Sequence, residues 1–155
     1  MKEICETLKK RFLLMEKIAA YKFIHNLPLC DSEREKWMKI TLETKANEMQ
    51  LSVDGVLIFW DVLMDLAKKV QSNILCRYFY DEKFYAGAIT NIADVRKEIE
   101  ELDDMLLKNI ANFYEETVEL LPEDFILFCD TVDVAHLSIM EKKFLFDALQ
   151  CVTLN

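Results

Sequence analysis

The sequence predicts a single all-α domain, a helical bundle of about five or six helices around one long central helix. The chain has 155 residues, which is the size of one domain. It is 52% hydrophobic and 30% charged, a composition typical of a globular chain with a sizeable core. It has only 2 Gly and 2 Pro. These are too few for the turns of a β-sandwich or for a glycine-rich phosphate-binding loop.

The first helix is expected over about residues 2–25, because apolar residues recur there at three- and four-residue steps. These residues are Leu8, Phe12, Met15, Ala19 and Phe23. Pro28 disfavours helix at the residue before it and ends this element. A second helix is expected over about 32–50, with Asp31 as its N-cap and acidic residues in its first turn.

The long central helix is expected over about 53–86, capped by Ser52 or Asp54 and closed by Gly87. Its in-phase apolar residues are Val56, Phe59, Leu63, Leu66, Val70 and Ile74.

The remaining helices are marked by capping residues and one proline. A fourth helix, about 91–121, begins at Thr90 or Asn91 and is stopped by Pro122. A short helix near 123–130 follows, and a last one runs from Ser138 to about Gln150, with Ser138 and Glu141 as a capping box.

The net charge of −9 argues against a nucleic-acid or anionic-membrane partner, because either needs a basic surface. The charge is unevenly distributed. Residues 1–80 carry 13 basic and 11 acidic side chains, whereas residues 81–155 carry 6 and 17. The first half therefore suits a small anion, and the acidic run of Glu98, Glu100, Glu101, Asp103 and Asp104 is expected to be a solvated helix face.

No run of eighteen apolar residues is present, so the sequence predicts no membrane-spanning helix. The first twelve residues carry charges throughout and do not resemble a signal peptide. We therefore expect a cytoplasmic protein, or a periplasmic or secreted one whose signal was removed before residue 1.

The five cysteines show no C-x-x-C pair and there are two isolated histidines, so no zinc or other metal site is expected. They fit reduced core thiols, or a single disulfide for which Cys129 and Cys151 are the pair to test.

Arginine is scarce, and three of the four arginines fall into a regular set of spacings. Arg11 and Lys22 are eleven residues apart, about three helical turns, and therefore lie on one side of the first helix. Arg34 follows after 12 residues, Gln71 after 37 more, and Arg96 after a further 25. Taken singly, each basic residue also fits a side chain that lies along the edge of the core with its charge in water.

Taken together, these residues resemble the AroQ-type, all-helical chorismate mutases. The matching text is "RFLLMEKIAAYKFIHNLPLCDSERE" and "FWDVLMDLAKKVQ", and the Arg96 offset is similar to that of the γ subclass, whose members are usually secreted. The resemblance implies a single domain over 1–155, with a mutase core over about 1–88. A helical extension over about 89–155 would complete the site. It also implies a homodimer.

Chorismate mutases convert chorismate, a dianion, to prephenate by an intramolecular pericyclic rearrangement that requires no cofactor. The resemblance implies that Arg11, Arg34 and Arg96 hold the two carboxylates, since guanidinium groups bind carboxylates bidentately. It implies that Lys22 and Gln71 donate to the ether oxygen, that Glu35 accepts from the ring hydroxyl, and that Asp31 helps to place the substrate. Gln71 donates at any pH, whereas the Glu of some members must be protonated.

The sequence departs from the family at two positions expected to contact substrate. Ala67 stands where the family often has Ser or Thr, and Met38 where some γ members have Gln. Each change removes a hydrogen bond, on the order of 1 kcal/mol, and weakens binding without abolishing the chemistry. Two alternatives remain: a catalytically degenerate homologue that binds a small anion or a protein, and an unrelated acidic interaction protein.

Overall fold

The computed structural model describes residues 1–80, 91–117 and 119–155. These residues form seven helices, connected by loops and turns. The helices are α1 (Lys2–Leu13), α2 (Met15–Ile24), α3 (Ser32–Glu48), α4 (Val53–Tyr80), α5 (Ile92–Glu116), α6 (Pro122–Thr131) and α7 (Ile139–Leu149). The all-α prediction is therefore confirmed.

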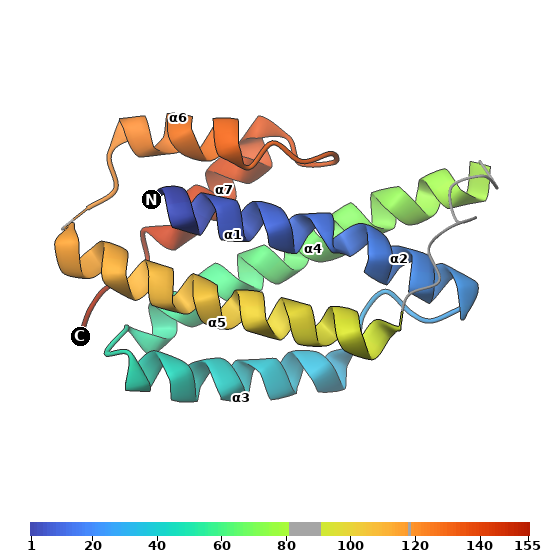
Figure 1. The fold of residues 1–155 in the computed structure, drawn as a ribbon, viewed down its shortest axis with the longest axis horizontal. Coiled ribbons are helices and arrows are strands. Elements are labelled where there is room, and N and C mark those ends of the chain that lie inside the picture. The colour runs from blue at the N-terminus through green and yellow to red at the C-terminus, as the bar shows by residue number, and fades with distance from the viewer. Residues whose placement is uncertain (81–90, 118) are drawn as a thin grey trace.

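Helix α4 is the long central element (Figure 1). Its 28 residues extend for about 42 Å. Helices α2, α3 and α7 pack against it, while α1 packs against α5 and α6. The predicted apolar residues of α4 are all buried, from Val56 to Ile74. The proposed closure of this helix at Gly87 lies outside the described residues.

Helices α1 and α2 correspond to the single predicted helix over 2–25, interrupted at Leu14. The backbone there stays in the helical region, and hydrogen bonds continue from Leu14 to the Lys10 carbonyl and from Ile18 to the Leu14 carbonyl. The interruption is therefore local, and the two helices follow one another along the bundle (Figure 1). This arrangement keeps residues of both helices on one side of the bundle.

Polar caps begin four of the helices as the sequence predicts. At the start of α4 the Ser52 hydroxyl accepts the Gly55 N–H at 3.2 Å. The Asp31 carboxylate accepts the Arg34 N–H, the Asn91 side chain accepts the Ala93 N–H, and Ser138 forms a capping box with Glu141. The end predicted for the fourth helix was wrong. Helix α5 ends at Glu116, and Pro122 begins α6, because proline lacks an N–H and suits the first turn of a helix.

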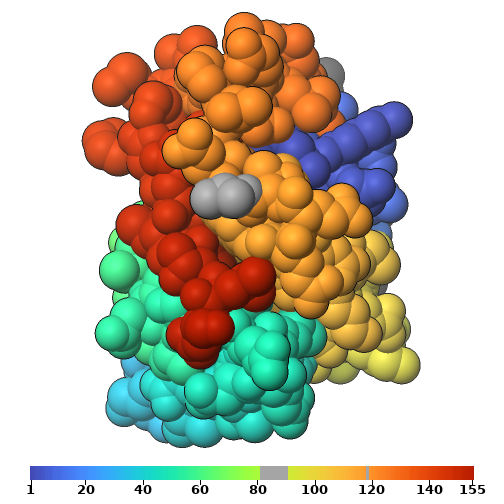
Figure 2. All heavy atoms as spheres, turned by 90° about the vertical axis from the view of Figure 1, so that its left-hand side faces the viewer, coloured from blue at the N-terminus to red at the C-terminus, as the bar shows by residue number. Residues whose placement is uncertain are grey.

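The C-terminal segment crosses over the start of α4. Leu154 forms a β-bridge with Leu51, and the Ser52 N–H donates to the Thr153 carbonyl at 2.8 Å. Figure 2 shows this segment against the α3–α4 turn. At Gly55 a Cβ atom would lie 2.1 Å from the Cys151 carbonyl oxygen, so the close approach of the two backbones requires glycine. These contacts hold the start of α4 against the C-terminal segment.

All five cysteines are free thiols, so a Cys129–Cys151 disulfide does not form in this structure. Cys5 is buried in the core and Cys129 is half-buried, whereas Cys30, Cys76 and Cys151 are exposed. The expectation of five buried thiols was therefore wrong for these three. Within the described ranges, none of the helices has the length and apolar character needed to cross a lipid bilayer.

Candidate functional site

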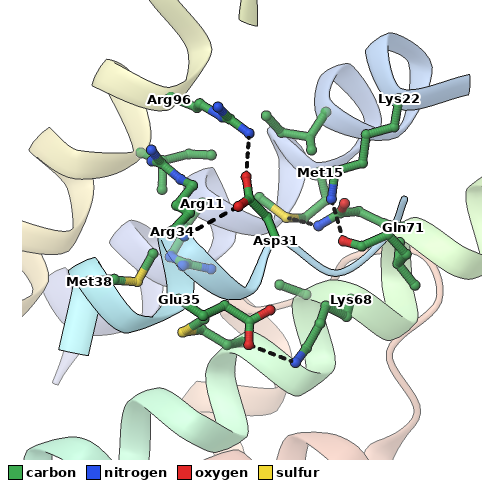
Figure 3. Close-up of a pocket in the computed structure, with 15 residues that line it drawn as sticks. Arg11, Met15, Lys22, Asp31, Arg34, Glu35, Met38, Lys68, Gln71 and Arg96 are labelled. Carbon is green, nitrogen blue, oxygen red and sulfur yellow. Dashed lines mark hydrogen bonds and ion pairs between the residues drawn. The ribbon is translucent and has the colours of Figure 1, made fainter. Parts of the chain in front are cut away.

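A cavity lies between α1, α2, α3, α4 and α5 (Figure 3). Its empty volume is about 600 Å³, part of which is open to solvent. Every residue that the sequence analysis assigned to a site lines it. They are Arg11, Lys22, Asp31, Arg34, Glu35, Met38, Ala67, Gln71 and Arg96.

The helical periodicity determines which residues of each helix face the cavity. Arg11 on α1 and Lys22 on α2 point to the same side because they are about three turns apart. The Asp31 cap begins α3, so that Arg34 and Glu35 fall in its first turn at the edge of the cavity. Gln71 lies deep in α4, and Arg96 lies in the first turns of α5.

The lining of the cavity is cationic in a chain that is acidic overall. Five cationic side chains and two carboxylates line it, so its local charge is three units positive, against −9 for the whole chain. The cations are Arg11, Lys22, Arg34, Lys68 and Arg96, and the carboxylates are Asp31 and Glu35. Asp103 and Glu100, just outside the lining, pair with Arg11 and Arg34 and offset part of this charge, and the donors that remain open favour a small anion.

Arg11 is the most deeply buried of these cations, with 3% of its surface exposed. Its Nε donates to Oδ1 of Asp103 on α5 at 2.6 Å. Its Nη1 is buried and has no hydrogen-bond partner among the described residues. Burial raises the pKa of Asp103, and the Arg11 guanidinium counteracts part of that rise.

Arg34 and Arg96 have counter-ions that are more exposed. Arg34 donates to Glu100 on α5 at 3.1 Å, and Arg96 donates to Asp31 at 3.0 Å. Asp31 also accepts the Arg34 backbone N–H at 3.2 Å, so one carboxylate both caps α3 and pairs with α5. Both guanidiniums keep part of their surface open, which leaves donors available to a ligand.

Lys22 is a buried ammonium, 8% exposed, at the wall of the cavity. It donates to the Leu29 carbonyl at 2.5 Å and so holds the segment that precedes α3. Burial lowers the pKa of Lys22, and the nearby Asp31 carboxylate opposes this shift. Lys22 is therefore a desolvated donor, whose interaction with a negative charge is stronger than in water.

Gln71 is also buried, and its amide has only a weak partner. Its Nε2 donates to the Met15 sulfur at 3.4 Å, and its Oε1 has no partner within the described residues. A thioether is a poor acceptor, so an ether or carboxylate oxygen in the cavity would be a better one. Figure 3 shows Gln71 and Lys22 on the same side of the cavity.

Sequence reasoning missed Lys68, which lines the cavity and donates to Glu35 at 3.5 Å. Lys68 precedes Gln71 by three residues, a spacing that places both on one face of α4. The same spacing rule identifies Met64 and Ala67. Ala67 and Met38 contribute no side-chain hydrogen-bond donor to the wall, as their residue types require.

The expectation of a solvated helix face was wrong for Asp103, whereas Glu100 keeps 42% of its side chain exposed. Asp103 is buried against Arg11, and Glu100 pairs with Arg34. Arg96, Glu100 and Asp103 follow one another at four- and three-residue steps, so they share one face of α5. The spacing shows that these residues share a face, but only the packing of α5 against α1 shows that Asp103 on this face meets a buried arginine.

Three comparisons with known proteins agree with one another. The family model for chorismate mutase type II matches residues 2–72, a segment that contains Arg11, Lys22, Arg34 and Gln71 but not Arg96. A monofunctional chorismate mutase from Enterobacter agglomerans is 26% identical over 146 residues, which cover 94% of this chain and 80% of that protein.

The fold is that of solved chorismate mutases along nearly the whole chain. A secreted chorismate mutase from Yersinia pestis matches with a TM-score of 0.89 at 20% identity, covering 99% of this chain and 98% of that one. A chorismate mutase from Burkholderia thailandensis matches with a TM-score of 0.74 at 16% identity, covering 97% of each chain. At these identities the two structures establish the fold alone.

Proposed function

We propose that this chain, whose residues 2–72 match the family model for chorismate mutase type II, is a chorismate mutase that converts chorismate to prephenate. One observation carries the proposal. Five cations and one buried amide, from five helices, converge on a single cavity whose lining has an excess of positive charge. Chorismate is a dianion with a bridging ether oxygen, and the cavity offers donors for both features.

The reaction makes few chemical demands on the protein. Carbon–carbon bond formation and ether cleavage occur within one molecule, so no nucleophile and no proton transfer are needed. Catalysis then consists of holding the compact chair-like conformer and stabilising the negative charge that builds on the ether oxygen. Both tasks require donors that are held in place before the substrate arrives.

In this proposal the three arginines hold the substrate carboxylates. Arg11 offers its unpartnered Nη1, while Arg34 and Arg96 offer guanidinium edges that their carboxylate partners leave open. Bidentate contacts fix the direction as well as the position of a carboxylate. The two carboxylates of chorismate would then set the angle between its side chain and its ring.

Lys22 and Gln71 donate to the ether oxygen in this proposal. Lys22 is desolvated, which strengthens its attraction for the charge that develops as the carbon–oxygen bond breaks. The Gln71 amide exchanges the Met15 sulfur for the ether oxygen, a stronger acceptor. Glu35 accepts from the ring hydroxyl, and its contact with Lys68 holds the carboxylate at the cavity wall.

Ala67 and Met38 are the weak points of the proposed site. Both line the cavity with apolar atoms, so the substrate polar groups beside them rely on water or on Lys68. This arrangement supports the expectation of weaker substrate binding with the chemistry retained.

Similarity to the secreted Yersinia pestis enzyme supports the proposal that this protein also acts after export.

We expect Arg34→Ala to lower kcat/KM for chorismate by about a hundredfold or more, because a desolvated carboxylate contact is worth about 3 kcal/mol. Steady-state kinetics on the folded variant measure the effect. Lys36→Ala is the matched control, since Lys36 lies on the same helix, is exposed and pairs with Glu33. A loss below about fivefold in folded Arg34→Ala would remove Arg34 from the site.

Gln71→Glu should make the activity depend on acid pH, because only a protonated carboxyl can donate to the ether oxygen. We expect kcat/KM at pH 5 to exceed that at pH 8 by about tenfold or more, since glutamic acid ionises within or below this range. In the wild type the amide does not titrate. The lowered pKa of Lys22 brings the alkaline decline to lower pH than an ordinary lysine would.

The measurement for this prediction is a kcat/KM profile of both proteins, with exposed Gln150→Glu as the charge-matched control. Equal ratios of the pH 5 and pH 8 values in the variant and the wild type would show that Gln71 does not contact the ether oxygen.

We also propose that each chain holds a complete site, with the extension over about 89–155 supplying Arg96. Arg11, Lys22, Arg34, Gln71 and Arg96 of one chain line one cavity, which supports this view. The homodimer stays a prediction. Inactive Arg34→Ala and Arg96→Ala chains, co-refolded together, should regain no activity. Sites shared between chains would instead return about a quarter of the wild-type activity. Half of the dimers would be mixed, and one of the two sites in each mixed dimer would carry neither substitution.

A further inference from the structure

We propose that Asp103 is a positioning residue that orients the Arg11 guanidinium for the substrate carboxylate. This inference rests on the proposed function and adds a residue that does not itself line the cavity. Asp103 lies on α5 and Arg11 on α1, 92 positions apart in the sequence. Their contact is the point at which the C-terminal part of the chain reaches the innermost cation.

The contact is short and closed to water. Arg11 Nε and Asp103 Oδ1 are 2.6 Å apart, and the two residues are 3% and 7% exposed. A guanidinium is a planar fork of five N–H donors, so a bond at Nε fixes the plane and the directions of the other donors. Arg11 therefore has little rotational freedom while Asp103 holds it.

The remaining donors of Arg11 are prepared for a ligand. Nη1 is buried and has no partner within the described part of the chain, although a buried donor without a partner costs about 1–3 kcal/mol. Arg11 lines the cavity, so a substrate carboxylate is the group that would satisfy it. Asp103 thus occupies one edge of the guanidinium and leaves Nη1 for the reaction.

A carboxylate suits this position better than a neutral acceptor. Arg11 is almost fully desolvated, and a buried cation without a counter-ion is strongly destabilising. The charged groups that act on Asp103 are Arg11, Asp104 and Arg34. Asp103 also shares its helix face with Arg96, so the same contact sets how α5 presents Arg96 to the cavity.

A double-mutant cycle on the full chain tests the proposal. Asp103→Asn keeps the shape and an acceptor oxygen but removes the charge. We expect it to lower kcat/KM for chorismate by about tenfold or more, because a small misplacement of a catalytic donor is costly. Asp104→Asn is the matched control, since Asp104 is the adjacent carboxylate and pairs with Lys45 outside the cavity. It should stay within about twofold of the wild type.

The decisive comparison is made in the Arg11→Ala background. If Asp103 acts through Arg11, Asp103→Asn causes no further loss of kcat/KM there, whereas a general structural defect would persist. Activity of Asp103→Asn equal to that of Asp104→Asn, or an undiminished loss in the Arg11→Ala background, would overturn the inference. A wild-type chain that does not convert chorismate would instead refute the proposed function.

A second measurement needs no Asp103 variant. The Arg11 Nε–H resonance of the wild-type protein can be assigned by its loss in Arg11→Lys. Bonded to a buried carboxylate, this proton should exchange slowly with water at neutral pH. Rapid exchange, as for an exposed arginine, would contradict the proposed role even if every Asp103 variant failed to fold.

Discussion

The structure depends on holding several positive charges close together before any anion arrives. Cations that converge on one cavity repel one another, and burial removes the water that would stabilise them. The chain meets this constraint with carboxylates on the side away from the cavity or at its rim. Asp103, Glu100 and Asp31 pair with Arg11, Arg34 and Arg96. The chain as a whole is acidic, and part of that acidity provides these counter-ions.

The same pairs hold the bundle together across long sequence distances. Arg11–Asp103 connects α1 to α5, Arg34–Glu100 connects α3 to α5, and Arg96–Asp31 connects α5 to the start of α3. The members of each pair are at least 65 positions apart. The first pair is buried, so its loss would leave an uncompensated charge. The other two are partly exposed and contribute less to stability, which suits donors that exchange partners with a substrate.

Much of this arrangement could be predicted from the sequence, because helical periodicity and capping act locally. Asp31 and Ser138 marked helix starts correctly. The resemblance to the AroQ-type chorismate mutases selected Arg11, Lys22, Arg34, Gln71 and Arg96, which all line the cavity. Lys68 escaped notice although its spacing to Gln71 placed it on the same face. The interruption of the helix at Leu14 could not be predicted, because neither proline nor glycine stands at that position.

The burial of Asp103 could not be predicted from local sequence patterns. Charge counting predicts a solvated acidic residue, and only the packing of α5 against α1 reveals that this position faces a buried arginine. A charged residue is buried when a partner from elsewhere in the chain meets it, and one helix by itself contains no record of that partner. The exposed thiols of Cys30 and Cys151 escaped prediction for a related reason, since cysteine is apolar enough for a core but does not require one.

The central claim is that donors held by the fold are sufficient to convert chorismate to prephenate. The most direct test follows the loss of chorismate and the appearance of prephenate with the purified chain in the presence of a metal chelator. The account predicts turnover in proportion to enzyme concentration, with prephenate equal to the chorismate consumed. No turnover, together with a raised melting temperature on adding a dicarboxylate analogue of the chair-like transition state, would contradict it and identify a binding protein instead.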